Sequence, residues 1–248
     1  ELMQLDAGSW FNQAHPQSAR KKFKGQTIAT LEDVTFFSRG YRYEREANGR
    51  RVFNTDKDVL KSCYVRDSRD NGHRPGLYIE TKEPHLFPEI EYDLYRELKR
   101  LGMLDKTLKS APFYRNGTVN VGQTAGKLVL QTFSKASLKT LHEVFPGVPL
   151  CFLLCLGDGD MPSDDLQTYT EYVQYAVDNG AHFIGPSICG APNYYPELLQ
   201  PWEAQLIHSR GLLTHAYSFD TEEQMETYAN DVPLADGMFT NRSDLTLA

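Results

Sequence analysis

Short apolar strands alternate with amphipathic helices from residue 76 to the end of this sequence. The stretch 149–156 is apolar on both faces, which is typical of a parallel strand that is covered by helices. The expected helices carry apolar residues three and four positions apart, and several end at a glycine. Alternating units of this kind predict an α/β fold with a parallel sheet and right-handed helical crossovers. The expected strands cover 77–82, 127–133, 149–156, 183–185, 212–219 and 235–240, and the expected helices cover 88–102, a segment opened by Ser134, 164–179, 196–210 and a segment capped by Thr221.

Six strands are two fewer than a closed (β/α)8 barrel needs. The first 75 residues contain an expected helix from Thr30 and a polar stretch at about 41–75 that resembles an insertion. An open six-stranded arc has two unpaired edges, which soluble proteins normally avoid. Two explanations stay open: unrecognised strands within 41–70, or a chain that lacks the beginning of its barrel. We favour the second.

The strand at 77–82 brings an acid and a base to one edge of the expected sheet. Strand side chains alternate between faces, so Tyr78, Glu80 and Lys82 share one face. A carboxylate beside an ammonium group suits a hard divalent cation and an anionic substrate. Alternation alone does not distinguish such a site from a structural ion pair at the end of a strand.

Composition excludes several classes of protein. The net charge of −7 argues against nucleic acid as the main partner. Apolar runs stay shorter than the roughly 18–20 residues of a membrane-spanning helix. The four cysteines form no CxxC pair and show no zinc-like spacing. A length of 248 residues fits one large α/β domain.

Several segments resemble the glycerophosphodiester phosphodiesterases. Each alone is a weak signal, but their common order along the chain is specific. The segment 214–219 resembles the "hPYTfR" of the periplasmic-type branch, which favours a periplasmic or secreted location although the sequence does not identify the compartment. The other matching segments are 5–11 (like "lDaGsWF"), 28–34 (like "iPTLeeVl"), 77–82 (like "lnIEiK"), 129–133 (like "viiqSF") and 235–241 (like "vDGifTD").

The resemblance implies a TIM (β/α)8 barrel of the phosphatidylinositol-phosphodiesterase-like type. It implies that residues 1–248 form a single glycerophosphodiester phosphodiesterase domain, with the insertion at about 41–75. Such enzymes use Ca²⁺ or Mg²⁺ and two histidines to convert a small glycerophosphodiester into an alcohol and glycerol 3-phosphate. Glu80 corresponds to a metal-binding glutamate of the family, and Lys82 to a residue that contacts phosphate. Their chemistry is coherent, because a cation neutralises phosphate oxygens while an imidazole moves the proton.

The chain departs from the family's pattern at its N-terminus. The family's "HRG", "ExD" and "HD" segments precede the segment that begins this chain, so we expect the first two barrel strands to be absent and no catalytic set to be complete. The 248-residue chain alone is therefore expected to hydrolyse glycerophosphocholine poorly or not at all. The alternative is a catalytically inactive barrel that binds phosphodiesters or a protein partner.

Four further residues are candidates for substrate binding. His215 and Tyr217 share one face of a strand and are expected at the mouth of the barrel, although a hydrogen-bonded core histidine and a packed tyrosine explain them equally well. Gln131 and Phe133 either line the same pocket or simply pack. The sequence does not determine the head group, the choice of cation or the oligomeric state.

Overall fold

A computed structural model describes residues 2–56, 59–104, 114–115, 118–119, 128–157, 160–229 and 234–246. The chain divides into two compact units, Glu1–Leu77 and Tyr78–Ala248. Strand β5 (Leu77–Glu80) begins at this boundary. Each unit is described by itself.

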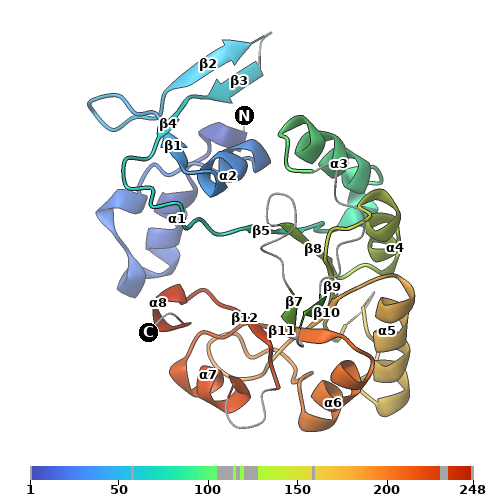
Figure 1. The fold of residues 1–248 in the computed structure, drawn as a ribbon. Helices are drawn as coiled ribbons and strands as arrows, with labels where there is room; N and C mark the ends of the chain where they lie inside the picture. Colours follow the sequence, from blue (N-terminus) through green and yellow to red (C-terminus); the bar gives the residue numbers. More distant parts are fainter. Residues whose placement is uncertain are drawn as a thin grey trace. The chain divides into compact units, whose positions relative to one another are not determined.

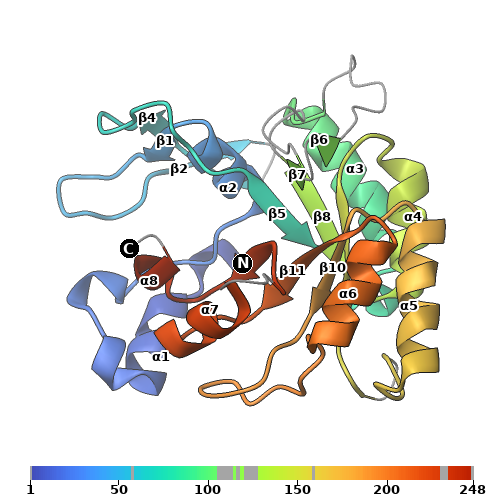
Figure 2. The same cartoon turned by 60° about the horizontal axis from the view of Figure 1, so that its bottom comes forward.

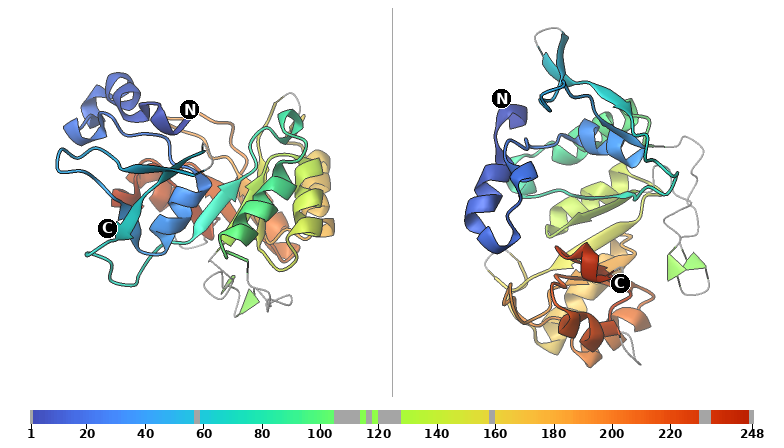
Figure 3. Two further views of the ribbon diagram at one scale, coloured as in Figure 1. Left: turned by 90° about the horizontal axis from the view of Figure 1, so that it is seen from above. Right: turned by 90° about the vertical axis from the view of Figure 1, so that its left-hand side faces the viewer.

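The first unit combines short helices with two antiparallel strand pairs. Strand β1 pairs with β4 and strand β2 pairs with β3. Figure 3 shows the β2–β3 pair as the light-blue to cyan hairpin. The polar stretch expected to be an insertion thus contains four short strands, which the sequence pattern did not reveal. The elements are α1 (Ala7–Ala14), α2 (Leu31–Ser38), β1 (Tyr41–Tyr43), β2 (Phe53–Asp56), β3 (Val59–Ser62), β4 (Tyr64–Arg66) and 3-10 turns at Leu2–Gln4, Pro16–Ser18 and Lys21–Phe23.

Helix α2 begins with a capping box and carries a buried carboxylate. The Thr30 hydroxyl accepts a hydrogen bond from the Asp33 backbone amide, and the Asp33 side chain accepts one from the Thr30 amide. Asp33 is fully buried and also accepts hydrogen bonds from Arg51, Ser62 and Tyr64. Burial alone would raise the pKa of Asp33, but the hydrogen bonds from Ser62 and Tyr64 hold it below its ordinary value. This network joins α2 to the strands of the first unit.

The second unit is built from strands and helices that alternate along the chain, as the sequence predicts. Its remaining strands are β6 (Tyr114–Arg115), β7 (Thr118–Val119), β8 (Leu128–Thr132), β9 (Leu150–Leu154), β10 (Phe183–Pro186), β11 (Leu213–Tyr217) and β12 (Gly237–Phe239). Its helices are α3 (Ile90–Arg100), α4 (Lys135–Val144), α5 (Leu166–Asp178), α6 (Pro201–Ser209), α7 (Glu222–Ala229) and α8 (Ser243–Thr246), with a 3-10 turn at Pro84–Leu86.

Within the described residues, six strands of this unit form one sheet in the order β12-β11-β10-β9-β8-β5. Neighbouring strands from β8 to β12 are parallel, and β5 joins at the β8 edge, where the Thr81 amide donates to the Gln131 carbonyl oxygen. Helices α3 to α7 follow the outer side of these strands as a curved row (Figures 1 and 2). The sequence prediction of six parallel strands with helical crossovers is confirmed, and together they form a half-barrel.

The inner face of the half-barrel is filled by side chains. Val129, Cys151, Leu153 and Phe183 form a buried cluster there. Tyr78 crosses this interior from β5, because its ring lies 4.8 Å from that of Phe239 on β12, at the other edge of the sheet. Side chains therefore connect the two edges of the sheet.

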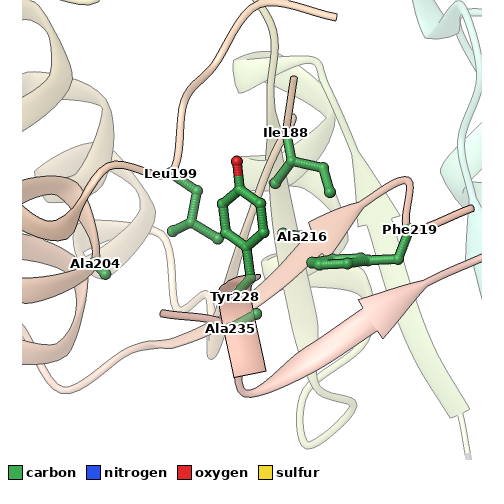
Figure 4. Packing of buried hydrophobic residues seen from close by; sticks show 7 residues of the cluster. All are labelled: Ile188, Leu199, Ala204, Ala216, Phe219, Tyr228 and Ala235. Carbon is green, nitrogen blue, oxygen red and sulfur yellow. The ribbon is translucent and has the colours of Figure 1, made fainter. Parts of the chain in front are cut away.

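A second cluster lies between the sheet and its outer helices. The Tyr228 ring of α7 lies between Ile188 and Leu199 (Figure 4) and packs edge-on against Phe219 at 5.6 Å. This cluster attaches the last helices to the sheet. No helix among the described residues is both long and apolar enough to pass through a bilayer.

Candidate functional site

Side chains from the ends of five strands, β5, β8, β9, β11 and β12, meet in a cavity of about 350 Å³ at the carboxyl edge of the sheet. Parallel α/β sheets bind ligands at this edge, because loops and helix starts converge there. Five of the six residues expected at a substrate or metal site line the cavity, namely Glu80, Lys82, Gln131, Phe133 and Tyr217. The other lining residues are Leu153, Tyr195, Ser218, Phe239, Thr240 and Asn241.

Glu80 and Lys82 form an ion pair at the end of β5. Lys82 Nζ lies 3.4 Å from Glu80 Oε1, and 68% of the lysine side chain is exposed compared with 27% of the glutamate. The ammonium group also lies 5.1 Å from the centre of the Phe133 ring. The lysine end of the pair is exposed, whereas Glu80 Oε1 is buried. The Lys82 ammonium is accessible to an anion in the cavity, and Glu80 Oε1 would need a cation or a hydrogen-bond donor if Lys82 turned away.

Aromatic rings form one wall of the cavity. The Tyr217 ring packs edge-on against Phe133 at 5.9 Å and against Tyr195 at 5.5 Å. The Tyr217 hydroxyl donates a hydrogen bond to the Leu154 carbonyl oxygen at 2.8 Å. Burial, followed by the nearby Cys155, raises the pKa of Tyr217 far above its ordinary value. Tyr217 therefore shapes the wall and does not supply a proton at neutral pH.

Two oxygen atoms in this region accept no hydrogen bond among the described residues, although one of them, Glu80 Oε1, forms the ion pair with Lys82. They are Glu80 Oε1 and Gln131 Oε1, both buried, on the neighbouring strands β5 and β8. A buried oxygen without a hydrogen bond is costly, so such atoms commonly bind a hydrogen-bond donor or a cation that is not part of the chain. Carboxylate and amide oxygens are also the ligands that Ca²⁺ and Mg²⁺ prefer.

These two oxygens fit a divalent cation only in part. Ca²⁺ takes about 6–8 oxygen ligands and Mg²⁺ about six. Among the described residues, no group of three or more His, Cys, Asp or Glu side chains is arranged to hold a metal ion. Glu80 and Gln131 are thus suitable ligands, but the described part of the chain does not form a complete metal site.

His215 lies away from the cavity. Its ring stacks on Phe183 at 3.9 Å, and its Nδ1 lies 3.0 Å from the Tyr78 hydroxyl. A Cβ atom at Gly237 would come within 2.5 Å of this ring, so the glycine makes room for it. Burial lowers the pKa of His215 to about 4, which keeps the imidazole neutral at neutral pH. The geometry matches a hydrogen-bonded core histidine.

The spacing of residues along β11 explains why His215 does not reach the cavity although Tyr217 does. His215 and Tyr217 share one face, but residues two apart in a strand are separated by roughly 6.6 Å. Tyr217, at the end of β11, reaches the cavity, whereas His215 lies one layer deeper, between the rings of Tyr78 and Phe183. Alternation predicted the correct face but not the depth.

A second and larger cavity of about 720 Å³ adjoins the first. Glu80, Lys82 and Phe133 line both cavities. The larger cavity is otherwise lined by the loop after β5, the start of α4, residues that follow β9 and one residue of α5. These additional residues are Thr81, Glu83, Pro84, His85, Ser134, Lys135, Ala136, Cys155, Asp160 and Tyr172.

Sequence reasoning missed several residues of both cavities. Ser218 directly follows strand β11, and Thr240 and Asn241 are the first two residues after β12, so their place after a strand was an available signal. Lys135 is likewise the first residue of the helix that follows β8. Tyr195 belongs to the long connection between β10 and α6, and no local pattern marks it.

The chain is similar to a curated bacterial enzyme. It is 28% identical, over 245 residues, to the glycerophosphodiester phosphodiesterase of Bacillus subtilis (strain 168), and the aligned region covers 99% of this chain. It spans 61% of the length of that relative. A scan against known protein-family descriptions found no match.

Solved structures share the fold. A candidate glycerophosphoryl diester phosphodiesterase from Silicibacter pomeroyi DSS-3 superposes with a TM-score of 0.50 and 17% identity, over 71% of this chain and 50% of that chain. A candidate glycerophosphodiester phosphodiesterase from Galdieria sulphuraria gives a TM-score of 0.47 and 14% identity, over 69% of this chain and 56% of that chain. The structural likeness at 0.50 places the half-barrel among α/β barrels of this type, and the sequence likeness is to the glycerophosphodiester phosphodiesterases.

Proposed function

We propose that this chain supplies the phosphate-binding pocket of a metal-dependent phosphodiester hydrolase, which converts glycerophosphodiesters to an alcohol and glycerol 3-phosphate. The supporting observation is the Glu80–Lys82 ion pair at the carboxyl edge of a parallel sheet, next to the buried Gln131 Oε1, which accepts no hydrogen bond among the described residues. The whole-chain likeness to the Bacillus subtilis enzyme supports the same reaction class. Membership of that family, and its periplasmic-type branch, are part of the proposal.

The reaction exchanges one P–O bond for another. A water oxygen attaches to phosphorus, the bond from phosphorus to the head-group oxygen breaks, and that oxygen leaves as an alcohol with a proton. A divalent cation, when bound, supplies positive charge beside the phosphate oxygens. In this proposal, the Lys82 ammonium holds the phosphate, and Glu80 and Gln131 offer oxygens to the cation.

The described residues assign no group that moves the proton. Among them, His85 lines the larger cavity and no histidine lines the smaller one. The neutral, buried His215 is excluded from this role by its position. Hydrolysis is therefore a proposal about the protein as it is made from its complete gene, and phosphate binding is a proposal about this chain.

The experiment separates binding from hydrolysis. Calorimetry measures binding of glycerophosphocholine to the 248-residue chain, and release of glycerol 3-phosphate measures hydrolysis by the complete gene product with added Ca²⁺ or Mg²⁺. We expect both. Binding without hydrolysis by the complete product would instead support the alternative of an inactive barrel that binds phosphodiesters. Absence of both would refute the proposal.

A matched pair of variants identifies the phosphate contact. Lys82→Met should weaken binding or catalysis by about 100-fold, the size typical of losing one charge-stabilising contact. Lys139→Met changes an exposed lysine of helix α4 in the same way, outside both cavities, and should have no effect. Equal effects of the two substitutions would show that Lys82 is not the contact.

A further inference from the structure

We propose that the larger cavity binds the head-group alcohol of the diester and prefers an uncharged, hydroxyl-rich alcohol over a cationic one, with Lys135 as the residue that sets this preference. The inference rests on the proposed function in one respect, that the diester phosphate lies at Glu80 and Lys82. The cavity has about 720 Å³ and opens beside this pair. It is large enough for a head group, since small-molecule sites commonly measure about 300–1,000 Å³.

The position of the cavity gives each half of a diester its own space. Glu80, Lys82 and Phe133 line both cavities and so mark their border. A phosphate bound at this border has two ester arms, and one can extend into each cavity. The more spacious cavity suits the arm that varies between substrates, which is the head group.

The charges around the larger cavity do not favour an anionic head group. Its described lining residues include three carboxylates, on Glu80, Glu83 and Asp160. They include only two ammonium groups, on Lys82 and Lys135. A head group with a carboxylate or a second phosphate would meet excess negative charge.

The aromatic rings do not favour a quaternary ammonium group either. Such a group binds over the face of an aromatic ring. Here the chain's own ammonium groups hold these places, with Lys135 Nζ 3.5 Å from the Tyr172 ring centre and Lys82 Nζ 5.1 Å from that of Phe133. A choline-type cation entering the cavity would approach these two positive charges.

Neutral hydroxyl groups match the carboxylates and ammonium groups that line the larger cavity. A hydroxyl group both donates and accepts hydrogen bonds, so it can bind carboxylates and ammonium groups alike. Glu83 and His85 form an exposed pair at 3.5 Å, and Asp160 accepts from the Cys155 thiol at 3.0 Å. The carboxylate oxygens that these contacts do not use can accept hydrogen bonds from hydroxyl groups.

The Lys135 ammonium group offers hydrogen-bond donors to the hydroxyl oxygens of such a head group. Its ammonium group contacts the rings of Tyr172 and Tyr175, and no carboxylate lies within 4.0 Å of it among the described residues. An ammonium group has three N–H bonds, and a ring face satisfies at most part of them. Hydroxyl oxygens of a polyol can accept the rest, whereas a trimethylammonium group has no acceptor.

The test compares two diesters that differ only in the head group, glycerophosphoinositol and glycerophosphocholine. Calorimetry on the 248-residue chain measures the dissociation constant of each. We expect the inositol diester to bind about tenfold more tightly, as one or two hydrogen bonds would give. Lys135→Met should reduce this preference to about twofold or less, because the inositol diester loses hydrogen bonds while the choline diester binds at least as tightly as before, and Lys139→Met should preserve the preference.

Three results would overturn the proposal: equal binding of the two diesters, tighter binding of the choline diester, or an equal loss for both diesters in Lys135→Met. If Lys135→Met does not fold, the comparison on the unaltered protein decides by itself. Release of glycerol 3-phosphate by the complete gene product is measured separately. Preference without hydrolysis refutes the proposed reaction alone, and hydrolysis without preference refutes the head-group site alone.

Discussion

Asp220 accepts two hydrogen bonds from Asn241, one from its backbone amide at 2.8 Å and one from its side-chain amide at 3.0 Å. The same carboxylate accepts a third from the Asn193 side chain at 2.9 Å. Asn241 lines the smaller cavity, and Asn193 belongs to the connection that carries Tyr195. Asp220, itself buried, thus holds together two segments that line the cavity.

Asp220→Asn should therefore loosen the cavity as well as weaken the fold. The new amide would present a donor to groups that are themselves donors, so the free energy of unfolding should fall by about 1–3 kcal/mol. Affinity for glycerophosphocholine should fall as well. Urea denaturation and calorimetry measure the two effects, with exposed Asp178→Asn as the control. A destabilised variant with unchanged affinity would show that Asp220 does not position the cavity.

Because Glu203 is buried, we expect the free energy of unfolding to depend on pH. This residue of α6 is fully buried, and burial raises its pKa to about 7. The folded protein therefore keeps a proton between pH 4.5 and 7 that the unfolded chain has already lost, so this contribution to stability falls as pH rises through that window. Glu203→Gln should remove this loss and raise the free energy of unfolding at pH 8 by about 1–3 kcal/mol.

Urea denaturation at pH 5 and pH 8 measures the effect. The gain from Glu203→Gln should be large at pH 8 and small at pH 5, where the native glutamate is already protonated. Glu171→Gln, on an exposed face of α5, should give no pH-dependent change. A gain of the same size at both pH values would contradict the raised pKa of Glu203 in the folded protein.

The buried ion pair of Asp33 and Arg51 should contribute strongly to the stability of the first unit. Asp33→Ala removes the acceptor for Arg51, which is 7% exposed, and leaves an unpaired buried charge. Loss of one partner of a buried pair costs about 3–5 kcal/mol. The matched control is Asp56→Ala, which breaks an exposed pair with Lys61 and should cost at most about 1 kcal/mol. Similar losses of unfolding free energy in the two variants would refute this ranking.

Glu80 and Lys82 should respond differently to added metal. Glu80→Gln keeps the side-chain volume but removes the negative charge, so metal affinity should fall at least about tenfold and high metal should restore part of the activity. Lys82→Met should weaken phosphate binding without rescue by metal. A metal titration of hydrolysis by the complete gene product checks both. Rescue of both variants, or of neither, would contradict the separate roles.

Local patterns in the sequence were enough to predict the class of fold and one face of the site. Six strands alternating with helices were predicted because apolar periodicity is a property of each segment by itself. The same alternation placed Tyr78, Glu80 and Lys82 on one face, and the cavity contains the last two. Glycines and capping residues marked the helix ends to within a few residues.

The depth of each residue and the partners of the loops depended on the tertiary structure. Alternation along β11 does not distinguish Tyr217, which reaches the cavity, from His215, which packs beneath it on Phe183. Lys135 meets Tyr172 although the two are far apart in the sequence, because helices α4 and α5 follow neighbouring strands. The sequence by itself determined the elements and their inward faces, since these depend on local spacing. The curvature of the sheet and the paths of its loops decided which side chains meet, since those contacts depend on all the elements packing together.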